Sequence, residues 1–253
     1  TDSGAIAAGA ITINTTGGAD AAARAVTIAG QTTNATSWNV STTDGAISID
    51  EDSATDLAAI TTTGSLAVVS AGSVTDSGVV SVGGTTAVTI ATTENVVLDS
   101  ANTFTGAMTF TAGGGGEGTA FGNVTVKNST VVKLDTNADT AGDLFLNAGT
   151  DWTVGGNLSI ISGGAITQGI QLGVTGAASF KTLNDTPKGI TLSDAANTFG
   201  AITAQARNAA DNADVSGAIA ISEGAAMAIA DISTTGTLSL TTTGALTQSG
   251  AIG

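Results

Sequence analysis

The stretch from Gly156 to Gln168, GNLSIISGGAITQ, alternates apolar with small polar residues, breaks at a glycine pair and then resumes the alternation. This pattern predicts two short β-strands joined at a tight corner. The same plan returns at residues 64–76 (GSLAVVSAGSVTD) and at residues 236–248 (GTLSLTTTGALTQ). Repetition of one strand–corner–strand unit along a chain is typical of solenoid proteins, so these stretches decide the expected fold.

Two kinds of apolar position keep their place in the repeats. The leucine of each copy and the residue six places before it are expected to face a common core, at equivalent corners. These residues are Leu66, Leu158, Leu238, Ile60, Trp152 and Ile232. A second landmark, Asn-Thr-Phe, occurs at residues 102–104 and 197–199. We expect its phenylalanines to fill the core and its asparagines to bond to the backbone of a turn.

The predicted strands are short, and Gly, Asn or Asp separates them every eight to ten residues or so. Coils of about twenty residues would place small residues at corners, where neighbouring coils stack about 4.8 Å apart. We therefore predict an all-β protein, a parallel β-helix (β-solenoid), with about ten to twelve coils. It would be one solenoid segment over residues 1–253, built from three imperfect units of about 82 residues, at about 1–74, 75–166 and 167–246.

The composition excludes several classes of function. The 253 residues include no cysteine and no histidine, which removes disulfides, thiol chemistry, the usual zinc ligands and histidine-based catalysis. Six Lys and Arg against 21 Asp and Glu give a net charge of −15, which argues against nucleic-acid binding. The chain contains no uninterrupted apolar run long enough for a membrane-spanning helix. No catalytic constellation is visible, so we expect a protein that is not an enzyme.

The sharpest chemical signal is a run of oxygen-bearing side chains that could wrap a calcium ion. The predicted ligands are Asp135, Asn137, Asp139 and Asp143. Glycine stands at loop position 8 instead of 6, and Leu146 takes the place of the bidentate glutamate at position 12. The alternative is a solvated turn between coils. The acidic clusters at residues 50–52 and at Asp211 with Asp214 are weaker candidates of the same kind. No other cofactor is expected.

Residues 157–180 (NLSIISGGAITQGIQLGVTGAASF) and 189–202 (GITLSDAANTFGAI) resemble the repeats of giant bacterial surface proteins related to filamentous haemagglutinin-type adhesins. Those adhesins are exported by two-partner or autotransporter routes. The resemblance implies a right-handed parallel β-helix, an extracellular location on the bacterial surface and a role in adhesion or in a surface filament. It brings no catalytic residues.

The leading functional hypothesis is a structural or adhesive segment of an extracellular fibre. The alternatives are a carbohydrate- or calcium-binding adhesin module, with surface polysaccharide as partner, and a β-helical polysaccharide lyase or hydrolase. Residues 1–6 (TDSGAI) and 247–252 (TQSGAI) repeat one motif, which predicts that the two ends share one phase of the repeat. We therefore expect the segment to belong to a longer chain or filament in which other copies or neighbouring repeats stack head-to-tail.

Overall fold

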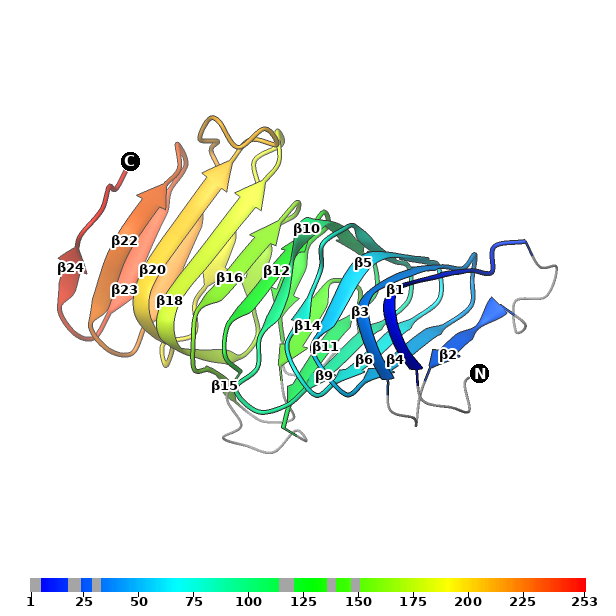
Figure 1. The fold of residues 1–253 in the computed structure, drawn as a ribbon. Coiled ribbons are helices and arrows are strands. Elements are labelled where there is room, and N and C mark those ends of the chain that lie inside the picture. The colour runs from blue at the N-terminus through cyan, green and yellow to red at the C-terminus, as the bar shows by residue number, and fades with distance from the viewer. Residues whose placement is uncertain (1–5, 18–23, 29–32, 114–120, 136–139, 147–150) are drawn as a thin grey trace.

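Two parallel β-sheets run side by side along one axis and form the whole of the regular structure (Figure 1). The computed structural model describes residues 6–17, 24–28, 33–113, 121–135, 140–146 and 151–253. Within these ranges the regular elements are strands, and every pair of neighbouring strands in the two sheets is parallel. The first strand, β1 (Ile6–Asn14), and the last, β24 (Leu246–Gln248), lie at opposite ends of the stack. The predicted parallel β-helix is confirmed.

The two sheets take alternate strands along most of the chain. The larger sheet has 13 strands: β1, β3 (Thr33–Ser41), β5 (Thr55–Thr62), β7 (Val74–Thr75), β8 (Val80–Val82), β10 (Val96–Phe104), β12 (Val124–Asn128), β15 (Asp151–Val154), β16 (Leu158–Ser162), β18 (Gln171–Leu183), β20 (Thr198–Arg207), β22 (Met227–Ser233) and β24. The smaller sheet has 11 strands: β2 (Val26–Ile28), β4 (Ile47–Glu51), β6 (Leu66–Ser70), β9 (Thr86–Ile90), β11 (Met108–Ala112), β13 (Val132–Leu134), β14 (Asp143–Leu146), β17 (Ile166–Gln168), β19 (Ile190–Leu192), β21 (Ile219–Glu223) and β23 (Leu238–Thr242).

Neighbouring coils are linked in register, so the length of a coil can be read from the strand pairs. One coil takes 20 residues from Leu66 to its partner Thr86, and another takes 20 from Leu158 to Ala178. The step from Val124 to Leu158 takes 34 residues, because β13, β14 and β15 are formed between these two strands. Eleven strands lie along the main path of each sheet in the described part of the chain. This number agrees with the ten to twelve coils expected from the sequence.

The core is a narrow column of aliphatic and aromatic side chains between the sheets. Ile60, Trp152 and Ile232 are buried in it, as predicted. Phe104 is also buried, and Phe199 packs edge-on against Phe180 with 6.1 Å between the ring centroids. Burial of each such side chain contributes about 1.5–3 kcal/mol, so a few apolar residues in each coil are enough to hold the stack.

The prediction of equivalent corners is wrong for one of the three leucines. Leu66 and Leu238 lie in the smaller sheet, whereas Leu158 lies in the larger one. All three point toward the core, Leu66 and Leu158 fully buried and Leu238 half-buried in the last strand of its sheet. The Gly-x-Leu motif therefore marks a strand that follows a corner. It does not say which sheet the strand joins, because both sheets have the same two-residue side-chain alternation.

Corners between the sheets are held by a recurring Ser/Thr-x-Gly motif. The Thr62 hydroxyl donates to the Gly45 carbonyl of the preceding coil (2.7 Å) and accepts the N–H of Gly64 (2.8 Å). The same two bonds are made at residues 70–72, 162–164, 234–236 and 242–244. One hydroxyl thus joins two coils and closes its own turn, which explains why a Ser or Thr two places before a glycine recurs in the sequence.

Buried polar side chains replace backbone bonds where a strand bends. Asn102 Oδ1 accepts the N–H of Val80 (2.8 Å), and its Nδ2 donates to Asp76 (2.6 Å). Asn197 Oδ1 accepts the N–H of Leu172 (2.9 Å) in the same way. Both asparagines are wholly buried, so the prediction that they bond to turn backbone is confirmed. Their amides satisfy N–H groups that would otherwise be unpaired inside the core.

Glu51 and Glu223 are both buried, and each accepts a backbone N–H through one carboxylate oxygen. They differ in the surroundings of the other carboxylate oxygen. Glu51 accepts the Ala35 N–H through Oε1 (2.7 Å) and the Trp38 indole N–H through Oε2 (2.6 Å). Glu223 accepts the Phe199 N–H through Oε1 (2.9 Å), and its buried Oε2 has no hydrogen-bond partner among the residues that the structure describes. Strand β20, which precedes it, contains no tryptophan. Burial raises the pKa of Glu223 above its ordinary value, against the lowering effect of the Phe199 bond.

Ile6 is the one residue of TDSGAI that the structure describes, and it does not share the repeat phase of Ile252, contrary to the expectation from TDSGAI and TQSGAI. Residues 1–5 lie outside the described residues. Ile252 bridges Ile232, which corresponds to Ile60 in the repeat. Ile13 pairs with Val40 and Val40 pairs with Ile60, so Ile13 has the same phase of the repeat as Ile60. Ile6 lies seven residues before Ile13 in the chain and therefore has a different phase. The physical reason is that β1 is one continuous strand of nine residues, whereas the chain bends between β24 and Ile252.

A glycine-to-alanine pair tests whether the stacking distance between coils requires small corners. A Cβ on Gly78 would lie 1.7 Å from the Ala58 carbonyl oxygen of the preceding coil, whereas a Cβ on Gly9 would meet nothing within 4 Å. We expect Gly78→Ala to destabilise the protein by about 1–3 kcal/mol, as overpacking does. Gly9→Ala is the control and should stabilise it by about 0.4–1 kcal/mol. Equal unfolding midpoints in a urea titration would contradict the close approach.

Replacing each glutamate by glutamine tests the unpaired oxygen. Glu223→Gln keeps the bond to Phe199 and removes a buried charge, so it should raise the thermal midpoint at about pH 8. A carboxyl whose folded pKa is raised gives most stability below its ordinary pKa and loses it as the pH rises. The gain should therefore vanish near pH 4 or so.

The control for Glu223→Gln is Glu51→Gln. This change places the NH₂ group of the new side chain against the Trp38 indole N–H, so that two donors face each other. It should cost about 1–3 kcal/mol at neutral pH. At about pH 8 the thermal midpoints of the two variants should thus move in opposite directions from wild type. A loss of stability in both variants would show that Glu223 has a second donor.

Candidate functional site

The predicted calcium site falls on the connection between β13 and β14, which are neighbours in the smaller sheet. Asp143 is wholly buried, and its Oδ2 accepts the Thr140 N–H (2.8 Å) and the Thr140 hydroxyl (2.7 Å). Asp135 is mostly buried. The other two predicted ligands, Asn137 and Asp139, lie outside the described residues. The structure therefore places two of the four predicted ligands on the same side of one corner.

A lysine that the sequence prediction did not include stands between these carboxylates. Lys133 is the register partner of Asp143, with its Nζ 3.5 Å from Asp143 Oδ1, and it forms an ion pair with Asp135. The hydrogen bond to Asp135 is the main reason that the pKa of Lys133 is raised, and the charge of Asp143 adds to it. An ammonium group thus occupies the place where the sequence suggested a cation. The described residues contain no group of three or more acidic side chains placed to hold a metal.

The weaker acidic candidates are also paired with other groups. Asp211 binds Lys181 (2.9 Å) and Arg207 Nε (3.1 Å), and Asp214 binds Arg207 Nη1 (2.5 Å). Burial would raise the pKa of Asp211, but the bonds from Lys181 and Arg207 hold it below its ordinary value. In the cluster at residues 50–52, Glu51 points into the core. These carboxylates are thus engaged within the protein, in ion pairs or in backbone bonds.

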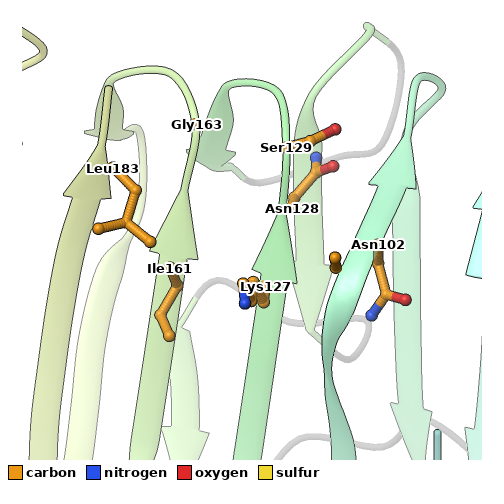
Figure 2. A pocket seen from close by; sticks show the side chains of 8 residues that line it. Asn102, Lys127, Asn128, Ser129, Ile161, Gly163 and Leu183 are labelled. Atoms are coloured by element: carbon orange, nitrogen blue, oxygen red, sulfur yellow. The ribbon is translucent and has the colours of Figure 1, made fainter. Parts of the chain in front are cut away.

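A shallow groove of about 190 Å³ opens where β10, β12, β16 and β18 lie next to one another (Figure 2). Its walls include the side chains of Lys127, Ile161 and Leu183, and Gly163 also lines it. Asn128 also lines the groove, but its side chain is already bonded to the backbone of Phe104. Its Oδ1 accepts the Phe104 N–H (2.9 Å), and its Nδ2 donates to the Phe104 carbonyl (3.1 Å). The groove therefore offers mostly aliphatic surface and one ammonium group to a ligand.

A second, more polar hollow of about 490 Å³ lies at the C-terminal end of the stack. It is lined by the Lys181–Arg207–Asp211–Asp214 ion pairs, together with Gln205, Asp231 and the last residues of the chain. Gln205 Nε2 donates to Asp231 Oδ2 (2.5 Å). Lys181 and Arg207 neutralise Asp211 and Asp214, whereas Asp231 is bonded to the neutral amide of Gln205, so the side chains that line the hollow carry two positive and three negative charges. In the described part of the chain, no helix has the length and apolar character needed to cross a bilayer.

The fold and these surfaces can now be compared with known proteins. A family model described as Repeats of unknown function (DUF5649) matches residues 44–111, 121–206 and 216–253. The chain belongs to this repeat family. No curated protein and no solved structure matches the chain. The three matches of the repeat family confirm a repeat protein. Their limits differ from the unit boundaries predicted from the sequence, which stay a prediction.

The first and third matches of the repeat family correspond residue by residue. Leu66 corresponds to Leu238, a difference of 172 in residue number (238 − 66), and Ile60 to Ile232 with the same difference. Lys133 and the groove were not found from the sequence. One signal for the groove was available, since Ile161 breaks the alternation of its strand and puts an apolar side chain outward. The contact of Lys133 with Asp143 gave no signal, because it depends on which strands become neighbours.

Replacing the lysine tests both the ion pair and the calcium prediction. We expect Lys133→Met to lower the midpoint of thermal unfolding, because Asp143 is buried and would lose its cation. Calcium in excess should then raise the midpoint of this variant relative to a chelator, since a ligand of the folded state stabilises it by mass action. Lys127→Met, which removes a lysine with no carboxylate partner among the described ion pairs, is the control. If calcium and chelator give the same thermal midpoint in wild type and in both variants, the calcium site is rejected. The turn is then one that is held by the ion pairs of Lys133.

Proposed function

We propose that this chain is a structural and adhesive segment of an extracellular bacterial surface fibre, which works through length and stiffness. The observation that carries the proposal is the uninterrupted stacking of coils from β1 to β24. At about 4.8 Å per coil, such a stack lengthens by adding repeats and keeps one cross-section. Each coil contacts its neighbours by backbone bonds and a shared core, which makes the rod stiff.

The outermost described strands have the same alternation of apolar side chains as the strands inside the stack. The last strands, β23 and β24, are half-exposed or exposed, and Leu246 and Ile252 are exposed large apolar residues. At the other end, Ile6, Ile11 and Ile13 only partly cover the core. Free strand edges with apolar side chains recruit further strands. Head-to-tail contact with neighbouring repeats, in the same chain or in another copy, would cover both ends.

The composition favours an exterior setting. The absence of cysteine and the net charge of −15 suit a protein that must stay soluble without disulfides at a cell surface. The sequence likeness to filamentous haemagglutinin-type repeats points the same way and supplies the adhesive part of the proposal. We do not extend the proposal to polysaccharide binding, because the groove at Lys127 offers one ammonium group and no aromatic ring for a sugar to stack on.

Labelling of the cells that make this protein tests the location. Antibodies raised against the folded chain should label intact cells, and negative-stain images of released material should show rods longer than the chain alone. An antibody to a cytoplasmic protein, which should label only after lysis, is the control for cell integrity. Labelling of the chain only after lysis would reject the extracellular fibre.

A further inference from the structure

The groove of Figure 2 lies on the outer face of the larger sheet, on the side of the rod. Lys127 on β12, Ile161 on β16 and Lys181 on β18 are register partners and form one outward row along the axis. Lys181 is paired with Asp211 (2.9 Å), whereas Lys127 belongs to none of the ion pairs of the described residues. The row therefore places an aliphatic side chain beside an ammonium group that has no carboxylate partner within the described chain.

The outer face of the smaller sheet has a row of opposite charge. Asp50 on β4, Val69 on β6 and Thr89 on β9 are register partners, and they alternate with the buried residues of their strands. Val69 is 45% exposed. Its neighbours on the same face include two alanines, Ala67 and Ala87. Val69 thus stands above small side chains and beside a carboxylate.

The two rows match each other in spacing and in apolar character. Neighbouring side chains in each row are one coil apart, about 4.8 Å. The groove of about 190 Å³ has room for the Val69 side chain, since a cavity of roughly 150 Å³ takes up a benzene ring. Ile161 and Leu183 in its walls would make aliphatic contact with the valine. Such a contact removes apolar surface from water on both sides.

The charges favour one direction of this contact. With the valine in the groove and two rods parallel, Asp50 of one copy lies beside Lys127 of the other. With the rods antiparallel, Asp50 would lie beside Lys181, whose charge Asp211 already neutralises. A carboxylate accepts several bonds at its two oxygens, so Asp50 can bind Lys127 and keep its interaction within its own chain. Charge complementarity therefore favours parallel rods.

We propose that copies of this chain associate side by side, with Val69 of one copy in the groove beside Ile161 of the other and Asp50 paired with Lys127. The contact joins the smaller sheet of one rod to the larger sheet of the next. Because these faces differ, each copy of a pair keeps one face unused, and the association continues as a bundle instead of closing into a dimer. The proposal goes beyond the proposed fibre, which lengthens along its axis, because this contact joins neighbouring rods through their sides.

Sedimentation equilibrium of the intact chain measures the association. At about 0.15 M salt, repulsion between charges farther apart than about 8 Å is largely screened, and we expect the average mass to rise with concentration. Val69→Asp should raise the dissociation constant at least about tenfold, because it puts a carboxylate into an aliphatic groove. Val79→Asp changes a valine of similar exposure (49%) outside the row and is the control, which should leave the constant unchanged.

Charge reversal separates the ion pair from general repulsion between acidic rods. The net charge is −15, so Asp50→Lys would strengthen the association if repulsion alone decided it. We expect Asp50→Lys and Lys127→Asp each to weaken it, by about fivefold or more, because like charges then meet. The double variant, in which the pair is reversed, should recover the wild-type constant. Stronger association in Asp50→Lys would overturn the proposal.

Disulfide trapping tests the direction, because the chain contains no cysteine of its own. In parallel rods Thr89 of one copy lies beside Lys181 of the other, so an equimolar mixture of Thr89→Cys and Lys181→Cys should form a linked dimer under mild oxidation. A mixture of Thr191→Cys and Lys181→Cys is the control, since Thr191 lies on the same outer face but outside the row.

Equal trapping in the two mixtures, or a monomer at every concentration, would overturn the proposal. Surface labelling of cells does not depend on contact between rods, so the lateral contact and the extracellular fibre can each fail alone.

Discussion

The hydrogen-bonded ladder between successive coils is the constraint on which the rest of this structure depends. Because every strand pair is parallel and most pairs keep one register throughout, a residue in one coil generally meets the residue at the same position of the next coil. Apolar residues therefore stack on apolar residues, and the core becomes a column of nearly constant width. The same ladder brings the corner backbones into contact, so that Gly78 and Gly250 have carbonyl oxygens where a Cβ would stand.

Polar side chains complete the ladder where the backbone alone cannot. Hydroxyls of the Ser/Thr-x-Gly corners bond to carbonyls of the preceding coil, and buried Asn102, Asn128 and Asn197 accept N–H groups at bends. On an outer corner, Asn123 and Asn157 do the same, each accepting the N–H at its own level in the next coil. These bonds are local to one corner, which allows coils of unequal length to stack without loss of register elsewhere. This is why units of uneven length still form one rod.

The charged groups of the described residues stabilise particular corners and ends. Lys133 joins Asp135 and Asp143 across two neighbouring strands, and Arg207 joins Asp211 and Asp214 near the end of the stack. In both sets one cation lies between two carboxylates and reduces the repulsion between them. The proposed fibre rests on the parallel stacking of coils from β1 to β24.

The sequence by itself determined the class of fold and the inner face of most strands. The alternation in residues 156–168 and its two repeats predicted short parallel strands, and the buried positions of Ile60, Trp152, Phe104 and Asn102 agree with it. Only the tertiary structure decided which sheet each strand joins, as Leu158 shows, and which residues meet between coils, as Lys133 and Asp143 show. The physical reason is that side-chain alternation is local to a strand, whereas the turn angle at each corner and the order of stacking depend on contacts between residues 20 or more apart in the chain.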